Sequence, residues 1–147
     1  MSKIEERLKE LGLELPIAGT SVGNYLGCKR SGDLLFAAGR VSSLAGEVGT
    51  AITEAQAKIA ARDTVLMILA IIKNEIKDID ELKAVVKMQG FVRSAPGFTK
   101  QPAVIDGASD LLIEIFGEDG RHARTATGIN ELPFGASVQL DIIFQLK

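Results

Sequence analysis

The final ten residues, 138–147, constrain the fold more than any other part of the chain. Apolar side chains occupy every second position there: Val138, Leu140, Ile142, Phe144 and Leu146. Alternation with a period of two over this length predicts a β-strand with one buried face. A second strand is expected just before it, over residues 122–130, because that run is rich in small and β-branched residues. The two expected strands flank a corner at Leu132-Pro133.

Arg124 is the residue to explain in the first of these two strands. No acidic side chain lies close to it in that strand, and its neighbours Ala126 and Gly128 are small. Small neighbours leave space above the guanidinium. A planar, permanently charged fork in such a setting suits bidentate capture of a carboxylate or phosphate. The alternative is a surface arginine that is paired with an Asp or Glu from elsewhere in the chain. Gly128 in the same strand suggests a bulge or the close approach of another backbone.

Three helices are expected, over residues 2–12, 53–77 and 101–117. The first two begin with capping boxes, in which a Ser or Thr is followed three residues later by Glu or Gln. Apolar residues of the long second helix recur at i, i+3 and i+4 and form a wide stripe, as in a helix that packs on a sheet. We expect the short first helix to cover part of the sheet or a subunit contact.

The remaining segments predict three more strands. Residues 19–40 are typical of a hairpin, with a first strand around 25–28, a turn at 31–33 and a return strand over 34–38. Residues 82–93 predict a further strand, whose core face carries Leu82, Ala84, Val86, Met88 and Val92. Its outer face carries Val85 and Phe91 among lysines, and apolar spots of this kind are compatible with subunit contacts.

This order of elements predicts the fold class. Helices and strands follow each other as helix, hairpin, helix, strand, helix, strand, strand, which indicates an α+β domain with helices on one face of a mainly antiparallel sheet. At 147 residues we expect a single domain over 1–147, with 1–14 as an N-terminal helical extension.

Composition argues against several classes of function. A net charge of −2 and a pI near 5.5 are unfavourable for holding a nucleic-acid backbone. The single cysteine, Cys28, excludes an internal disulfide and is expected to be a small buried hydrophobe. The single histidine, His122, excludes a His-based metal cluster and is expected to be solvated. No metal or cofactor is expected.

The charged N-terminus predicts no signal peptide, and the longest apolar run, 65–72, is too short to span a bilayer. A soluble, cytoplasmic protein without membrane or nucleic-acid partners is therefore expected.

The arginine, the corner and the final strand together resemble a known signature. Arg124, seven intervening residues, Leu132-Pro133 and an alternating strand are similar to the C-terminus of the Rid (reactive intermediate deaminase, or YjgF-like) family. Older usage calls these proteins L-PSP endoribonucleases. The resemblance covers roughly residues 18 to 146. The family's arginine falls on Arg124, its tyrosine before the first strand falls on Tyr25, and its Gly followed by a polar residue falls on Gly39-Arg40.

Three positions depart from the family's pattern. Ala38 stands where many members carry a serine, and Asp106 stands where many have an asparagine that faces the pocket. The glutamate of the last strand, which is thought to assist the catalytic water, is replaced by Gln139. An amide cannot exchange a proton at ordinary pH, although it can still orient a water molecule. Asp141, two residues along on the same face, is a candidate substitute.

The resemblance implies a chorismate-mutase-like fold assembled as a homotrimer, with pockets at the subunit interfaces. It also implies a short-lived imine or enamine substrate such as 2-aminoacrylate, whose carboxylate the arginine holds while water releases ammonia. Gln139 would then be the catalytic position, and Arg124, Tyr25, Ala38, Asp106 and Ala126 would bind the ligand.

Three functions remain open from the sequence. The first is a binding module for a small carboxylate, keto acid or imino acid, with reduced catalysis. The second is a weak or specialised imine deaminase. The endoribonuclease of the older family name ranks last, because the net charge is unfavourable and the chain has no pair of histidines for acid–base cleavage.

Overall fold

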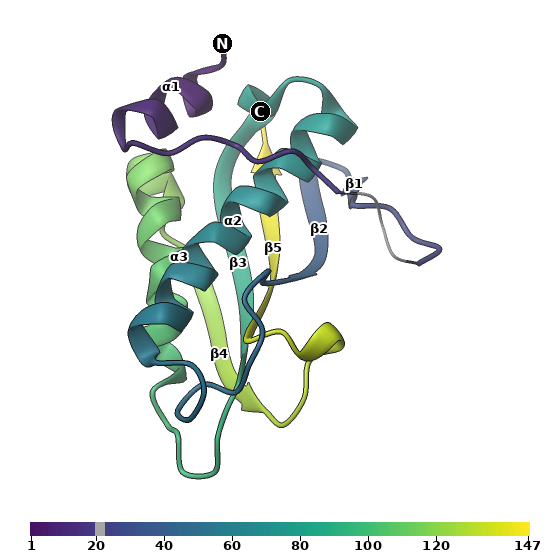
Figure 1. Cartoon of the computed structure of the whole chain (residues 1–147). Coiled ribbons are helices and arrows are strands. Elements are labelled where there is room, and N and C mark those ends of the chain that lie inside the picture. The colour runs from purple at the N-terminus through teal and green to yellow at the C-terminus, as the bar shows by residue number, and fades with distance from the viewer. Residues whose placement is uncertain (20–22) are drawn as a thin grey trace.

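A layer of helices lies on one face of a five-stranded sheet in the computed structural model, which describes residues 1–19 and 23–147 (Figure 1). The helices and strands in chain order are α1 (Lys3–Glu10), β1 (Cys28–Ser31), β2 (Leu34–Val41), α2 (Glu54–Ile76), β3 (Leu82–Arg93), α3 (Gln101–Phe116), β4 (Ala123–Ile129) and β5 (Val138–Leu146). Short 3-10 helices are η1 (Ile79–Glu81), η2 (Gly117–Gly120) and η3 (Pro133–Gly135). The prediction of an α+β fold with this order of elements is confirmed.

The final strand, β5, forms the middle of the sheet. The strand order is β1-β2-β5-β3-β4, and β5 is antiparallel to both of its neighbours. All five apolar residues of the alternating pattern are buried. β3 and β4 are parallel, and α3 supplies the crossover that a parallel pair requires. The sheet is therefore mainly antiparallel, as expected.

The helices α2 and α3 pack together on the same face of the sheet (Figure 1). Thr53 caps α2 through the predicted capping box, and Ala57 and Ala61 in its first turns are fully buried. Gly107 of α3 allows the two helices to approach closely, since a Cβ at that position would lie 2.0 Å from the backbone oxygen of Lys58. The close contact helps to hold α3 beside β4, the strand that carries Arg124.

The short helix α1 packs on other helices, not on the sheet. Ile4 and Leu8 are buried, and the Asp80 carboxylate accepts hydrogen bonds from the backbone N–H groups of Lys3 (2.8 Å) and Ile4 (3.2 Å). Arg7 Nε donates to the Glu114 carbonyl of α3 at 2.8 Å. From α1 the chain runs across α2 toward β1 (Figure 1). Of the two roles expected for this helix, covering the sheet was wrong, because its apolar stripe packs against η1 and α3, whereas a subunit contact stays a prediction.

The first hairpin strand begins later than predicted. β1 starts at Cys28, so Tyr25, Leu26 and Gly27 precede it. The chain passes close to α2 there, since a Cβ on Gly27 would lie 2.4 Å from Ile71 Cγ2. Tyr25 therefore lies outside the sheet and is 45% exposed.

The faces of β3 also differ from the prediction near its start. Val85 is buried and Val86 is 41% exposed, the reverse of the expected assignment. The pairing of β3 with β5 shifts register between Leu82 and Ala84 and again between Val85 and Lys87. Each irregularity inserts or removes a residue from the alternation, so the face that a side chain occupies changes. From Met88 onward the predicted alternation holds.

Candidate functional site

Arg124 is paired with Asp106, as in the alternative that the sequence left open, an arginine paired with an acidic side chain from elsewhere in the chain. Arg124 lies on β4, at the edge of the sheet, and its Nη1 donates to Asp106 Oδ1 at 2.7 Å and to Ser109 Oγ at 3.2 Å. Both acceptors project from α3. The pairing joins residues that are 18 positions apart, across the turn that connects α3 to β4.

His122 extends this polar network and is not freely solvated as expected. Its Nδ1 lies 2.6 Å from the carbonyl oxygen of Gly120, and its Nε2 lies 2.9 Å from Ser109 Oγ. A carbonyl only accepts, so Nδ1 carries the proton and the Ser109 hydroxyl donates to Nε2. Ser109 Oγ in turn accepts from Arg124. The network fixes the side of the guanidinium that carries Nη1.

Part of the Arg124 guanidinium remains accessible. Its side chain is 22% exposed, and that of Asp106 is 47% exposed. Among the described residues, Nη2 has one long contact, 3.4 Å to the carbonyl of Pro102, and Nε has no acceptor. Nε and Nη2 share the edge of a guanidinium that binds carboxylates side-on. The arrangement can therefore still hold one carboxylate.

The small residues beside Arg124 accommodate α3. Ala126 is partly buried against the core, and a Cβ on Gly128 would lie 2.8 Å from Gln101 Nε2 in the first turn of α3. The close approach at Gly128 is thus made by a side chain, whereas the sequence suggested a bulge or another backbone. The space beside Gly128 is therefore filled by Gln101.

Tyr25 and Gln139 meet in a different place. They line a cavity of about 210 Å³ together with Gly39, Arg40, Val41, Pro133 and Phe134. Gln139 pairs with Val41 across the β2–β5 ladder, where a register shift lies between Ala37 and Arg40. Gly39 brings the backbone close, since a Cβ there would lie 3.4 Å from Gln139 Nε2. Ala38 is half-buried next to Gly39, where it offers no polar group.

Arg40 and Phe134 are site residues that the sequence analysis did not assign. Arg40 has no salt bridge to a carboxylate within residues 1–19 and 23–147, and it also lines a neighbouring cavity of about 580 Å³ between β2 and α2. Phe134 is 76% exposed with a φ of 60°, and it borders both cavities. A positive φ is costly for an aromatic residue. The Gly39-Arg40 dipeptide was a visible signal, but Pro133-Phe134-Gly135 gave no sign of this backbone conformation.

One chain does not bring Arg124 and Gln139 together. Arg124 is in register with Met88, which is buried under the helices, so Arg124 lies on the helix side of the sheet. Gln139 alternates with buried residues of β5 and so lies on the opposite, open face. β3 also separates the two strands. The residues grouped by the sequence therefore lie in two separate places in one chain.

Asp141 lies two residues from Gln139 on the same open face. Burial raises the pKa of the Asp141 carboxyl, and the nearby charge of Lys87 partly opposes this increase. A carboxyl group with a raised pKa is a better proton donor near neutral pH than an ordinary aspartate.

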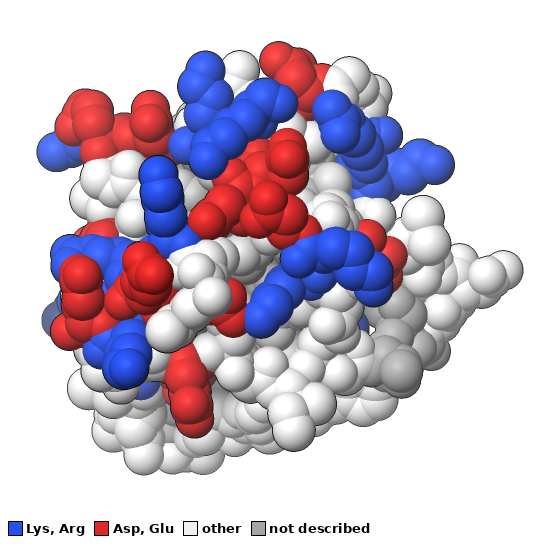
Figure 2. Space-filling model, turned by 90° about the horizontal axis from the view of Figure 1, so that it is seen from above, with Lys and Arg blue, Asp and Glu red and all other residues white. Residues whose placement is uncertain are grey.

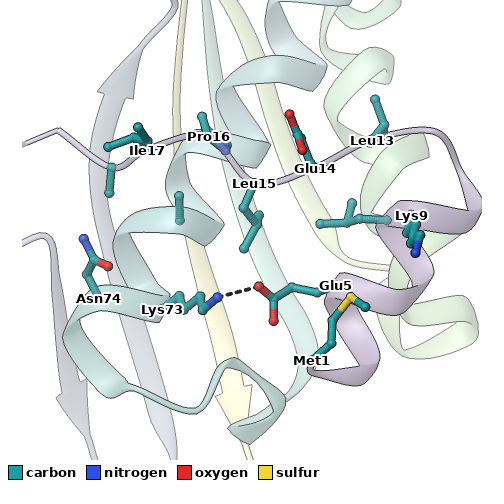
Figure 3. A pocket seen from close by; sticks show the side chains of 13 residues that line it. Met1, Glu5, Lys9, Leu13, Glu14, Leu15, Pro16, Ile17, Lys73 and Asn74 are labelled. Carbon is teal, nitrogen blue, oxygen red and sulfur yellow. Dashed lines mark hydrogen bonds and ion pairs between the residues drawn. The ribbon is translucent and has the colours of Figure 1, made fainter.

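A larger cavity, of about 600 Å³, lies between α1, residues 13–18 and α2 (Figure 3). Figure 3 shows the Glu5–Lys73 ion pair on one wall and Leu15 pointing into the cavity. The hydrogen bond from Lys73 lowers the pKa of Glu5 to about 2. Neither Tyr25, Gln139 nor Arg124 lines this cavity. Its size alone does not make it the site of the predicted chemistry.

Surface charge and buried groups bear on four other kinds of function: nucleic-acid binding, cysteine chemistry, metal binding and membrane insertion. On the face seen in Figure 2, basic and acidic side chains are interspersed and form no continuous basic surface. Burial raises the pKa of the Cys28 thiol to about 11, as expected of a buried cysteine and not of a nucleophile. In the part of the chain that the structure describes, no group of three or more His, Cys, Asp or Glu residues could hold a metal ion. No described helix is long and apolar enough to cross a membrane.

Comparison with protein-family models gives one match that spans nearly the whole chain. Residues 5–145 match the family described as YjgF/chorismate mutase-like, putative endoribonuclease. The chain belongs to this family. The match begins inside α1, so this YjgF-like protein resembles the family over more of its length than the region of the Rid signature. Protein TCP17 of Trypanosoma cruzi is 37% identical over 152 residues, which cover 99% of this chain and 95% of that protein.

Solved structures similar to this YjgF-like protein include some with 30% sequence identity or more and others with about 20%. A protein of unknown function from Agrobacterium tumefaciens has 41% identity and a TM-score of 0.90, covering 99% of this chain and 93% of that chain. A putative endoribonuclease from Shewanella oneidensis has 30% identity and a TM-score of 0.92, covering 97% and 99%. RidA from an Antarctic Psychrobacter species has 20% identity and a TM-score of 0.60, covering 88% and 94%. This last similarity shows the fold alone.

Proposed function

We propose that this YjgF-like protein binds small keto or imino acids through the carboxylate-binding edge of Arg124, with reduced catalysis. The observation that carries the proposal is the fixed guanidinium at the sheet edge, held by α3 through Nη1 while Nε lacks an acceptor among the described residues. A preoriented fork binds a planar carboxylate with little loss of side-chain entropy.

The complete pocket requires two subunits. Arg124 lies at the β4 edge on the helix side, and the Tyr25–Gln139 cavity lies beyond β3 toward the open face. In the proposed homotrimer, the β4 edge of one chain faces the Tyr25–Gln139 cavity of its neighbour. Apolar side chains that are exposed in the single chain support association, among them Phe36 (40%), Ile129 (41%) and Phe134 (76%).

Reduced catalysis follows from Gln139. Hydrolysis of an imine adds water to the imine carbon and releases ammonia, so a proton must leave the water and another must reach nitrogen. The Gln139 amide can orient the water but cannot transfer these protons. A slow imine deaminase is the second candidate, favoured by the raised pKa of Asp141 on the same face. An endoribonuclease has less support, because both ring nitrogens of His122, the only histidine, are already hydrogen-bonded.

Ligand titration tests the proposal. Pyruvate and 2-oxobutyrate titrated calorimetrically into the wild-type protein should bind, and Arg124→Lys should weaken binding by about 1 to 3 kcal/mol, since it keeps the charge but loses the fork. Arg121→Lys is a matched control: Arg121 is exposed three residues away and pairs with Glu118. Equal binding of both keto acids by wild type and Arg124→Ala would remove the basis of the proposal.

A further inference from the structure

The charge that faces a ligand of Arg124 is set by Asp106 as much as by the arginine. The two side chains form an ion pair at 2.7 Å, and both are accessible, Arg124 to 22% and Asp106 to 47%. Only one carboxylate oxygen of Asp106, Oδ1, has a hydrogen-bond partner within the described parts of the chain. A ligand that reaches Arg124 therefore meets a positive group and a negative group together.

This arrangement discriminates between ligands by charge. A simple monoanion gains from Arg124 but is repelled by the carboxylate a few ångströms away, and both interactions are strong at a partly desolvated site. A ligand that carries a cation next to its carboxylate satisfies both groups. Repulsion of the wrong ligand contributes to specificity as much as attraction of the right one.

The surrounding network keeps this pair of charges in place. Ser109 and His122 hold the Nη1 side of the guanidinium, with His122 anchored to the Gly120 carbonyl. Asp106 lies on the same helix as Ser109, less than one turn away, and the close α2–α3 contact at Gly107 fixes that turn. Arg124 cannot turn away from Asp106 without loss of its hydrogen bond to Ser109, and the Asp106 carboxylate is held by Arg124 itself.

We propose that, among the small carboxylates that the Arg124 site binds, Asp106 favours zwitterionic α-amino acids over keto acids of the same size, which bind more weakly. The carboxylate of the ligand binds the Nε–Nη2 edge of Arg124, and its ammonium donates to the free oxygen of Asp106. This inference rests on the proposed function, since it takes Arg124 to be the carboxylate anchor.

Three ligands with one carbon skeleton test the selectivity. Alanine, lactate and pyruvate share a carboxylate and differ at the second carbon, which carries an ammonium, a hydroxyl or a keto group. Calorimetric titration of each into the full-length wild type should give binding of alanine about tenfold tighter than that of lactate or pyruvate, the range of one charge-assisted hydrogen bond. Asp106→Asn keeps the acceptor for Arg124 but removes the charge, so alanine should weaken about tenfold while pyruvate tightens. Asp110→Asn, an exposed change one turn further along α3, should leave the ratio unaltered.

The outcomes separate this inference from the proposed function. If Arg124→Ala abolishes binding of all three ligands but Asp106→Asn leaves the alanine-to-pyruvate ratio unchanged, the role of Asp106 is wrong and the arginine site stands. If Arg124→Ala binds all three like wild type, or wild type binds none, both proposals are wrong. Should Asp106→Asn fail to fold in a thermal melt, the wild-type ranking decides: equal or tighter binding of pyruvate than of alanine overturns the inference.

Discussion

At the scale of single residues, we predict that turnover in the Tyr25–Gln139 cavity is limited by Gln139, because an amide side chain cannot exchange protons. Gln139 lines this cavity together with Tyr25 and lies close to Gly39, and the resemblance to the Rid pattern implies that a glutamate is usual at this position. Asp141 is the nearest residue along β5 that could supply a proton, and burial raises its pKa. We therefore expect a substitution at residue 139 to have a direct effect on turnover.

Gln139→Glu should raise the rate of imine hydrolysis. General acid–base assistance contributes about 10² to 10⁴-fold, so even an imperfectly placed carboxylate should be detectable. The measurement is ammonia or pyruvate release from freshly generated 2-aminoacrylate. Gln145→Glu is the control, because Gln145 lies on the same face of β5, six residues away.

Two results would contradict this prediction. Unchanged turnover in Gln139→Glu with keto-acid binding intact would place the chemistry elsewhere. If wild type is already fast and Asp141→Asn abolishes its activity, Asp141 is the proton carrier and the binding-module hypothesis should be dropped.

At the scale of elements, α1 is joined to α2 by one ion pair that also belongs to its N-terminal cap. Glu5 accepts hydrogen bonds from Ser2 in the capping box and from Lys73 of α2. These bonds lower the pKa of Glu5 from 4.5 to about 2. The charged form of Glu5 is therefore stabilised by folding.

The sign of the pH dependence follows from this lowered pKa. The stabilisation by Glu5 is fully present above its unfolded pKa of 4.5 and is lost as the pH falls toward 2. Glu5→Gln preserves the capping-box acceptor, so at pH 7 it should cost only about 0.2 to 1 kcal/mol of unfolding free energy, as for a partly exposed, solvent-screened ion pair. Urea unfolding at pH 7, 4.5 and 2 should show the difference from wild type disappearing at the lowest pH.

A loss of unfolding free energy that stays constant across this pH range would show that the charge of Glu5 is not responsible. The control is Glu10→Gln, which changes a more exposed ion pair with Arg7.

At the scale of the whole molecule, one face of the sheet is covered by helices and the other is open. Phe36 and Ile143 are paired neighbours on the open face, and Phe91 pairs with Gln139. The exposed aromatic Phe134 and the separation of Arg124 from Gln139 both suggest that a second chain completes the site.

We expect a homotrimer at micromolar concentration, measured by analytical ultracentrifugation. Phe36→Ser, on the open face of β2, should shift the population toward monomers and weaken keto-acid binding in parallel, because burial of an aromatic side chain contributes to association. Ile59→Ser, at an exposed position on α2, is the control. Phe98→Ser would not serve, because Phe98 packs against the core. A wild-type monomer that still binds keto acids would contradict the two-chain pocket.

Much of the fold could be predicted from the sequence because it depends on local patterns. The period-two alternation of residues 138–147 specified a half-buried strand, and the capping boxes at Ser2 and Thr53 specified where two helices begin. Gly117 ends α3 with a φ of 64°, as a glycine after a helix often does. Each of these features involves residues that are close in the chain, so the sequence displays both partners together.

The tertiary structure alone decided which side chains meet. Asp106 reaches Arg124 because α3 lies against the edge strand, and the separation of 18 residues gives no periodic sign of this contact. Val85 and Val86 exchange faces because the pairing with β5 slips, which depends on a strand more than fifty residues away. Arg40 and Phe134 border one cavity with Gln139 because the fold packs segments together that are distant in the chain. The sequence by itself thus determined the elements and the family, whereas the charge balance at Arg124 and the division of the site into two halves depend on packing and register between distant segments.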